Sequence, residues 1–380
     1  MITVLVYYER ISLYHTMIPF FLKNRENIKK TGKKLFHFTQ SVQWCLSKDK
    51  NTILFMERNF QYRQPQDLKE DELELLKQLR NKYKTIVFFC GQPEAGNNRM
   101  DILPYVDTLF YKSIFTDRAN YCKKLYGKNL FADYYHQNYG INDDPPYINK
   151  NEITQEDANK PLLSWNIGIG TYPRWHWRQR MGTFLARSGF HEIGKLIGGR
   201  RLKYFLNPNF LIKTPKDFSS ANRSIPVHAR IKPVTCPSIA HQRRHFLDCI
   251  SRFSQKDKDI FVTGRVPQNE YYKELFNSKI VLSPFGWGEV CFRDFETILT
   301  GGLLFKPDMS HLETFPNVYI PYETYIPLKW DGSDLLEQAQ KYIQDDKERM
   351  RITKNAYEQY KNELAKLPER FNTLLGEYFL

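Results

Sequence analysis

The chain has 380 residues, which is long for one hydrophobic core and sufficient for two. Hydrophobic residues make up 41% and aromatic residues 15%, a composition that excludes an intrinsically disordered chain. The formal net charge of +14 favours an anionic partner such as nucleic acid, an anionic membrane face or a phosphate-bearing substrate. The six cysteines have no metal-ligand spacing, and no apolar run suits a signal peptide or a membrane span, so we expect a soluble cytoplasmic protein with reduced thiols.

The N-terminal half alternates strand and helix patterns. Strands are predicted at residues 3–7, 35–38, 53–56, 85–90, 105–112 and 130–134, with an amphipathic helix over 67–83 and another helix over 117–125. This alternation predicts a parallel α/β sheet. The loops that follow parallel strands line the ligand cleft in such folds, so His15 and Glu57 become candidate site residues.

The loop at residues 91–96, GQPEAG, follows the most apolar of these strands. It places Glu94 at the carboxyl end of a buried strand, and Asp101 lies a few residues further along. A glutamate in a loop rich in proline and glycine is more often a solvated turn residue, and that alternative stays open.

A basic, aromatic stretch follows, in which Trp175 and Trp177 are interleaved with arginines. Such a segment suits stacking on bases, contact with lipid headgroups or binding of an anionic acceptor. It is equally typical of a helix with buried tryptophans and solvated arginines. No recognised nucleic-acid motif accompanies it, so nucleic acid is not the partner that we expect.

A second domain is predicted to begin near Ile225. Its first strand carries His228, Arg230 and Lys232 with a spacing of two, which puts all three on one face. A helix over 241–253 and a strand over 260–263 follow, and Arg265 comes directly after that strand. Arg230 and Arg265 are candidate phosphate contacts, although a charged face on an edge strand explains the first pattern as well.

The most informative stretch runs from residue 281 to 316. A buried strand ends at Leu282, residues 283–288 (SPFGWG) break it, and a helix is predicted from Glu289 to a stop at Gly301. The next strand covers 303–305. In a strand–loop–helix–strand unit the loop presents backbone N–H groups and a helix N-terminus, where phosphate is stabilised.

Three charged residues recur at helical spacing after this loop. Glu289, Arg293 and Glu296 are spaced i, i+4 and i+7, so a helix starting at Glu289 presents them on one face. This set suits a sugar nucleotide, with arginine for the diphosphate and a carboxylate for the ribose hydroxyls. The alternative is an exposed ladder worth only a few tenths of a kcal/mol per pair.

This stretch resembles the C-terminal domain of GT-B glycosyltransferases, most closely the exostosin-like group. That group has a serine-proline-glycine loop, an R-x-x-E helix, and then a glycine and a hydrophobic strand. The matching residues here are Ser283, Pro284, Gly286, Arg293, Glu296 and Gly302. The resemblance covers residues 225–350, and the N-terminal half only by architecture. The E-x7-E spacing of retaining enzymes is absent, which leaves the stereochemistry open.

The resemblance implies an α/β fold with two Rossmann-like domains (GT-B) facing a central cleft. Residues 1–165 would form the acceptor domain and 166–224 a basic connecting segment. Residues 225–350 would bind the nucleotide sugar, and helices over 351–380 would cross back to the first domain.

The implied activity is transfer of a sugar from a nucleotide diphosphate sugar to a hydroxyl of a glycan or lipid-linked acceptor, in glycan or glycolipid synthesis. No metal or further cofactor is expected, because positive charge replaces the metal at the leaving diphosphate. Peripheral contact with the anionic inner face of a membrane is one option for the acceptor side. The alternatives are a sugar-nucleotide epimerase, or a basic nucleic-acid or membrane-binding module with a degenerate nucleotide site.

The resemblance suggests the donor-binding roles below, and the positions after predicted strands suggest the candidate bases. Glu296 would hold the ribose, and Glu289 either the sugar or the helix end. Glu94 is the candidate catalytic base, and Glu57, His15 and Asp101 are weaker candidates. The residues expected to bind the donor diphosphate are Arg230, Arg265, Arg293 and the loop residues Ser283, Pro284, Phe285, Gly286 and Gly288.

Overall fold

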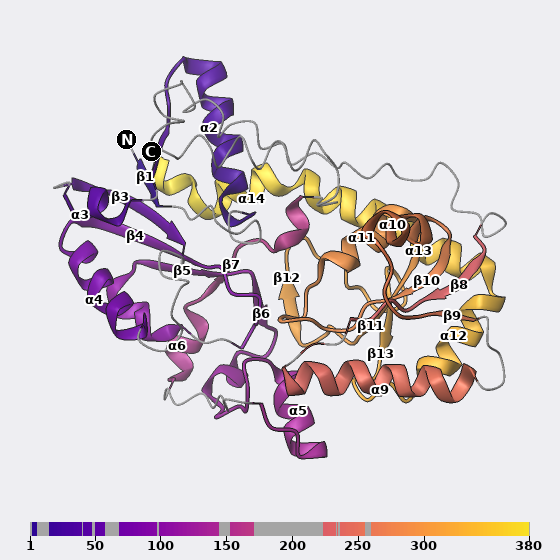
Figure 1. Ribbon diagram of the computed structural model, residues 1–380. Helices are drawn as coiled ribbons and strands as arrows, with labels where there is room; N and C mark the ends of the chain where they lie inside the picture. The colour runs from indigo at the N-terminus through magenta and orange to yellow at the C-terminus, as the bar shows by residue number, and fades with distance from the viewer. Residues whose placement is uncertain are drawn as a thin grey trace.

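The computed structural model describes residues 2–5, 15–39, 41–47, 50–57, 68–96, 99–143, 153–170, 223–232, 234, 236–254 and 260–379. Two parallel sheets lie side by side within these ranges (Figure 1). The basic stretch around Trp175 and Trp177 lies outside the described residues, as does the loop that follows the first strand.

The first sheet has six strands in the order β2-β1-β3-β4-β5-β7, and every neighbouring pair is parallel. The strands are β1 (Ile2–Leu5), β2 (Phe36–Thr39), β3 (Lys50–Glu57), β4 (Tyr83–Cys90), β5 (Thr108–Tyr111) and β7 (Leu162–Leu163). Its helices and 3-10 turns are η1 (His15–Met17), α2 (Ile18–Thr31), α3 (Val42–Leu46), α4 (Leu68–Arg80), η2 (Met100–Tyr105), η3 (Arg118–Cys122), α6 (Gln155–Asn159) and η4 (Ile167–Ile169).

Both faces of this sheet are covered because β4 alternates between two cores. Val87 and Phe89 pack with helix α2, whereas Ile86 and Phe88 pack with helix α4 and the η2 turn. A period of two places successive side chains on opposite faces, so a strand buried on both sides reads as a continuous apolar run.

The second sheet has the strand order β13-β11-β10-β8-β9, again all parallel. Its strands are β8 (Ile225–His228), β9 (Phe261–Val262), β10 (Ser278–Leu282), β11 (Leu303–Pro307) and β13 (Ile326–Leu328). In chain order this is the doubly wound arrangement 2-1-3-4-5, whose strand order reverses between β8 and β10. The predicted α/β fold with two Rossmann-like domains is confirmed.

Helices cover both faces of the second sheet as well. They are α9 (Pro237–Ser254), α10 (Gln268–Phe276), α11 (Phe292–Thr300), α12 (Leu335–Gln344) and α13 (Asp346–Ala365). Helix α5 (Leu130–Tyr139) comes from the first half of the chain, yet Phe131 and Tyr135 pack in the core of the second domain. Gln242 on α9 donates to the Tyr135 hydroxyl at 2.7 Å.

The carboxyl edges of the two sheets face each other. A short antiparallel ladder between β6 (Ser113–Phe115) and β12 (Leu312–Thr314) joins the domains (Figure 1). The loop after β4 also touches the loop after β10, because a Cβ added to Gly288 would lie 2.5 Å from the carbonyl carbon of Pro93. The strand ends that carry the candidate residues therefore meet at the domain boundary.

The C-terminal helix α14 (Leu367–Leu375), followed by η7 (Gly376–Phe379), returns to the first domain. Phe371 and Leu375 join the same core as helix α2, and Arg370 donates from Nε to the Ser164 carbonyl at 2.9 Å. Within the described residues, no helix combines the length and the apolar character that a membrane span requires.

Candidate functional site

A cavity of about 990 Å³ opens at the carboxyl ends of β8 and β9. It lies at the switch point of the second sheet, where ligands bind in doubly wound folds. Its lining residues are Arg230, Ile231, Lys232, Leu247, Thr263, Gly264, Arg265, Val266, Pro267, Gln268, Tyr271 and Arg293. The structure thus brings Arg230, Arg265 and Arg293 to one cavity from three separate segments of the chain.

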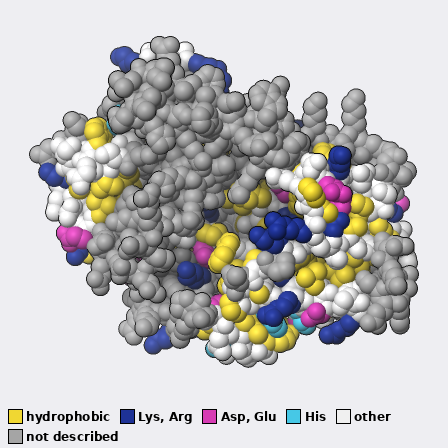
Figure 2. Space-filling model, in the orientation of Figure 1, with side chains coloured by type: hydrophobic (Ala, Val, Ile, Leu, Met, Phe, Trp, Pro, Cys, Tyr) yellow, Lys and Arg dark blue, Asp and Glu magenta, His cyan; other side chains and the backbone are white. Residues whose placement is uncertain are grey.

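Lys232 and Arg265 are the exposed cations of this cavity. Arg265 follows Gly264, whose φ of +85° is a backbone conformation that glycine adopts without strain. Dark blue Lys and Arg side chains gather near the middle of the face shown in Figure 2, over the second domain. Gln268, the first residue of α10, adds a helix N-terminus to the same wall, and both features favour an anion.

Arg230 is held by the protein itself. Its Nε donates to Glu274 Oε2 at 2.9 Å, and Nη1 donates to the Thr263 carbonyl. The guanidinium lowers the pKa of Glu274, which fixes this carboxylate in its charged form. Arg230 therefore reaches the cavity with most of its charge already compensated.

Arg293 joins the two strands at the switch point. Its guanidinium donates to the Leu282 carbonyl at 3.2 Å and to the Arg230 carbonyl at 2.8 Å. It also lies 6.0 Å from the ring centroid of Tyr271. These contacts position the ends of β8 and β10 relative to each other, and the side chain still lines the cavity.

Glu296 lies on the same helix, one turn on. The hydroxyls of Tyr271 and Tyr272 donate to its carboxylate, the first at 3.2 Å. Burial, together with the Glu296 charge, raises the pKa of Tyr271, so this phenol stays neutral and keeps donating. Tyr271 thereby connects Glu296 to the cavity, and nothing in the sequence pattern identifies this tyrosine as a site residue.

Residues 283–288, the glycine loop, use most of their own amides internally. Ser283 N–H donates to the Phe305 carbonyl at 2.8 Å, Phe285 N–H to Gln242 Oε1 at 2.8 Å, and Gly286 N–H to the Gly288 carbonyl at 3.0 Å. Pro284 has no N–H. Within this loop the exposed Trp287 offers its amide, whereas Gly288 is buried against Pro93, so the loop provides less than the full cradle that the sequence predicts.

A buried charged network lies beneath the glycine loop. Asp294 accepts from Ser283 Oγ at 2.6 Å and from the Tyr319 hydroxyl at 2.7 Å, and its carboxylate lies 3.0 Å from Lys306 Nζ. Asp294 and Lys306 are both fully buried. The Asp294 carboxylate also accepts from the Cys291 N–H at 2.9 Å, so one side chain fixes both the loop and the start of helix α11.

The prediction that Glu289, Arg293 and Glu296 share one helix face is wrong for Glu289. Helix α11 begins at Phe292, because the irregular loop before it continues as far as the N-cap residue, Cys291. Glu289 is fully buried at the domain boundary, where the amide nitrogen of Asn129, turned toward the carboxylate, lies 3.0 Å from both oxygens. His311 Nε2 lies 3.8 Å from Glu289 Oε1.

Phe285 is also fully buried, in the core of the second domain, so its side chain does not meet a ligand as the sequence predicted. Its carbonyl accepts from Nε and Nη2 of Arg243, at 3.2 and 3.1 Å. Arg243 lies in the middle of helix α9. Its role beside the loop becomes visible only from the hydrogen bonds that its guanidinium donates to the Phe285 carbonyl, far away in the sequence. Sequence reasoning missed Arg243, Asp294 and Lys306 for this reason.

Of the candidate bases, Glu94 lies next to Pro93, which contacts Gly288, so it stands at the domain boundary. Asp101 instead pairs with Arg99 Nε at 3.1 Å within the first domain. Glu57 ends strand β3 and His15 begins η1, and their side chains lie outside the described part of the structure.

His228 predicts a pH dependence of stability. It is fully buried, and this burial, together with the neighbouring Arg293 charge, lowers its pKa to about 3. The unfolded chain binds a proton below about pH 6.5, whereas the folded protein does not until about pH 3. The free energy of unfolding should therefore fall as the pH falls through this window, by up to about 1.4 kcal/mol per pH unit. In a His228→Gln variant, the free energy of unfolding measured with urea should depend less steeply on pH. An unchanged pH dependence would contradict this assignment.

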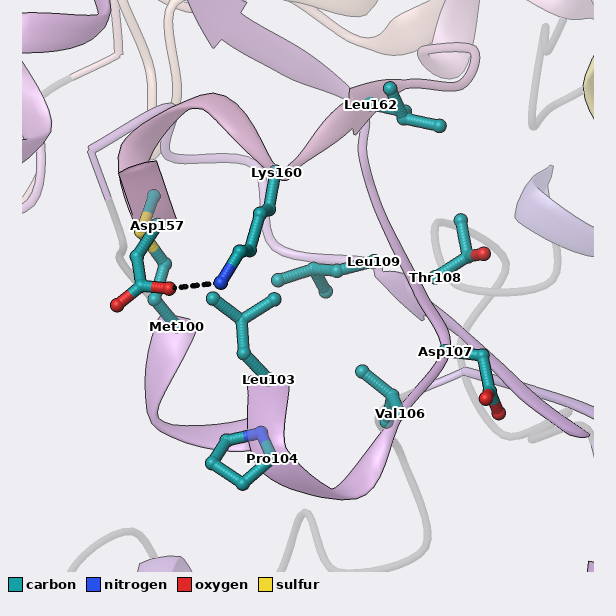
Figure 3. A pocket seen from close by; sticks show the side chains of 10 residues that line it. All are labelled: Met100, Leu103, Pro104, Val106, Asp107, Thr108, Leu109, Asp157, Lys160 and Leu162. Atoms are coloured by element: carbon teal, nitrogen blue, oxygen red, sulfur yellow. Dashed lines mark hydrogen bonds and ion pairs between the residues drawn. The ribbon is translucent and has the colours of Figure 1, made fainter. Parts of the chain in front are cut away.

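A second cavity, of about 520 Å³, lies at the opposite edge of the first sheet (Figure 3). Thr108 and Leu162, the first residues of β5 and β7, line it, and Lys160 pairs with Asp157 across its wall at 2.7 Å. Because amino ends of strands form this edge, the cavity is separate from the facing carboxyl edges.

Among the described residues, no group of three or more His, Cys, Asp or Glu side chains is arranged to hold a metal ion. One Asp-X-Asp triplet, the motif that binds metal in many sugar transferases, occurs at residues 257–259, where the placement is not described.

The second domain matches a known protein family. Residues 237–375 match the family described as "Glycosyl transferase-like". This stretch is somewhat more than a third of the chain, and it is similar to that family. The match includes the glycine loop, Arg293, Glu296 and helix α10, and with the two parallel sheets it supports a glycosyltransferase of the GT-B fold. The exostosin-like group is not distinguished by it, and no curated protein matches the chain.

The solved structures to which the chain is similar have low sequence identity to it. An alpha-glucosyltransferase in complex with UDP and a 13-mer DNA containing a HMU base is 11% identical, with 100% of this chain and 99% of that chain covered and a TM-score of 0.49. An alpha,alpha-trehalose-phosphate synthase (UDP-forming) from Burkholderia vietnamiensis is 12% identical over 88% of this chain and 77% of that chain, with a TM-score of 0.41. The similarity to glycosyltransferases therefore rests on the family match over residues 237–375 and on the sheet topology.

Proposed function

We propose that this protein transfers a sugar from a nucleotide diphosphate sugar to a hydroxyl group of an acceptor. The observation that carries the proposal is the cationic cavity at the switch point of the glycosyl transferase-like domain. Its size suits a nucleotide, since small-molecule sites typically span about 300–1,000 Å³. The donor would lie between the end of β8, the end of β9 and the start of α10.

The chemistry of the cavity divides it into two parts. Leu247, Val266 and the Tyr271 ring offer apolar surface for a base, and Arg265 and Lys232 offer positive charge for the diphosphate. The amide of the exposed Trp287 would extend the diphosphate site. Glu296, held next to Tyr271, remains our candidate for the ribose hydroxyls, where the tyrosines would orient the carboxylate.

In the transfer step, the acceptor oxygen forms a bond to the anomeric carbon while the bond from that carbon to the diphosphate oxygen breaks. A base takes the acceptor proton, and the cations stabilise the charge that develops on the leaving diphosphate. Glu94 is our candidate base, because its loop touches the glycine loop across the domain boundary. We further propose an exostosin-like enzyme with a glycan or lipid-linked acceptor that works without a metal.

Arg265 provides a test of the donor site. Replacing Arg265 with Ala should weaken binding of the preferred nucleoside diphosphate by about tenfold to a hundredfold, because a charge-assisted hydrogen bond contributes about 1.5–3 kcal/mol. The matched control is Lys273→Ala, since Lys273 is an exposed cation on helix α10 that does not line the cavity. Isothermal titration with UDP, GDP and ADP measures both variants, and equal effects would remove Arg265 from the site.

A thermal-stability panel of nucleotide sugars identifies the donor. A donor at 100 times its Kd should add about 2.7 kcal/mol to the free energy of unfolding. Release of free nucleoside diphosphate only when an acceptor is added would support transfer. A rearranged nucleotide sugar without such release would indicate an epimerase, and a panel without any shift would favour a basic binding module.

A further inference from the structure

Trp287 is the most exposed large hydrophobic side chain in the described part of the protein, at 60%. It lies in the glycine loop, between Gly286 and Gly288. Trp287 is not among the residues that line the 990 Å³ cavity, and the proposed donor site uses only its backbone amide, so that site does not account for the indole. A single exposed aromatic residue is common on protein surfaces, so the place of this indole in the fold decides what it can contact.

The backbone that carries Trp287 is held firmly on both sides. Phe285 is fully buried, its N–H donates to Gln242 at 2.8 Å, and its carbonyl accepts from Arg243. On the other side, the Gly288 backbone packs against Pro93 so closely that no Cβ fits. The indole is therefore presented from a fixed loop, which reduces the entropy lost when a ligand binds to it.

The position of this loop points to the acceptor side. One end of the loop contacts Arg243 of the second domain, and the other contacts Pro93 of the first domain. Trp287 thus stands where the acceptor domain meets the donor domain, beyond the proposed phosphate site. Glu94, the neighbour of Pro93, places a carboxyl group at the same boundary.

We propose that Trp287 is the platform on which a sugar ring of the acceptor stacks. This inference rests on the proposed function and names the acceptor class of that site. An indole face carries partial negative charge, which attracts the C–H face of a pyranose ring. The negative charge of Glu94, which follows Pro93 in the chain, repels the phosphates of a nucleic acid but not an uncharged sugar. A carbohydrate acceptor therefore fits this boundary better than DNA or RNA.

The test compares Trp287→Ala, Trp287→Phe and Phe276→Ala in the full chain. Phe276 is an exposed aromatic at the far end of helix α10, so it serves as the matched control. With the donor from the thermal panel, release of nucleoside diphosphate is measured with p-nitrophenyl glycosides of glucose, galactose, mannose and N-acetylglucosamine, and separately with duplex DNA.

We expect one of the saccharides to stimulate release of the nucleoside diphosphate. The Trp287→Ala substitution should raise the KM for that saccharide by about tenfold or more. The Kd for the nucleoside diphosphate should change less than about twofold. Trp287→Phe should recover most of the acceptor affinity, and Phe276→Ala should leave it unchanged. An unchanged KM in Trp287→Ala, a parallel loss of donor affinity, stimulation by no saccharide, or stimulation by DNA alone would overturn the proposal. Release that DNA stimulates, or that a saccharide stimulates without any effect of Trp287→Ala, keeps the proposed transfer and removes only this platform. A wild-type chain that binds no donor would instead contradict the proposed function itself.

Discussion

Replacing Gly288 with Ala should lower the free energy of unfolding by about 1–3 kcal/mol, as overpacking of a close contact does. The added Cβ would lie 2.5 Å from the Pro93 carbonyl carbon and 2.9 Å from the Pro93 Cβ. Neither group is the end of a flexible side chain, so the glycine loop and the loop at residues 91–96 must move apart. Because a misplacement of about 1 Å can cost a hundredfold in rate, we expect sugar transfer to fall by about that factor.

Gly376→Ala is the matched control, since a Cβ at Gly376 meets nothing within 4 Å and its φ of −59° suits alanine. Urea unfolding and acceptor-dependent release of nucleoside diphosphate should leave this variant close to the wild type. If Gly288→Ala behaves like Gly376→Ala in both measurements, the close approach of the two domains is wrong.

Replacing Asp294 with Asn should cost about 3–5 kcal/mol of stability, because it leaves the buried Lys306 ammonium without its counter-charge. The Asp294 carboxylate and Lys306 Nζ are 3.0 Å apart, and both side chains are fully buried. Asp294 also holds Ser283 and the Cys291 N–H, so the variant should loosen the glycine loop and weaken donor binding as well. Urea unfolding and titration with the nucleoside diphosphate measure the two effects.

The double variant Asp294→Asn/Lys306→Met should recover part of the lost stability, because neither charge then remains buried alone. An exposed pair provides the comparison. Arg351 and Glu323 lie 2.7 Å apart with side chains 41% and 55% exposed, so Glu323→Gln should cost at most about 1 kcal/mol. A similar small cost for Asp294→Asn would show that the network does not support the loop.

The fold was predictable because its strongest signals are local. The run TIVFFC in β4 is apolar on both faces, as a strand covered by two helix layers requires. Residues 130–134 were predicted as a strand and instead begin helix α5. A short apolar run does not distinguish the two, and here the packing of Phe131 and Tyr135 against the second domain decides.

The site was predictable only in part, because its geometry depends on contacts between distant segments. Spacing correctly draws attention to Arg293 and Glu296, but it cannot show that Tyr271 and Tyr272 bind the Glu296 carboxylate. The irregular loop delays the helix to Phe292, which removes Glu289 from the expected stripe. No periodicity pairs Asp294 with Lys306 across the βαβ unit, since that contact exists only when the strands are side by side.

The central claim is that the cavity at the β8–β10 switch point holds the donor nucleotide. A crystal structure of the full chain with the nucleoside diphosphate that gives the largest thermal shift tests it most directly. We predict a diphosphate about 3 Å from the Arg265 guanidinium and from the Trp287 amide, with the base against Tyr271. A nucleotide bound to the first domain, or one that leaves this cavity empty, would contradict the account.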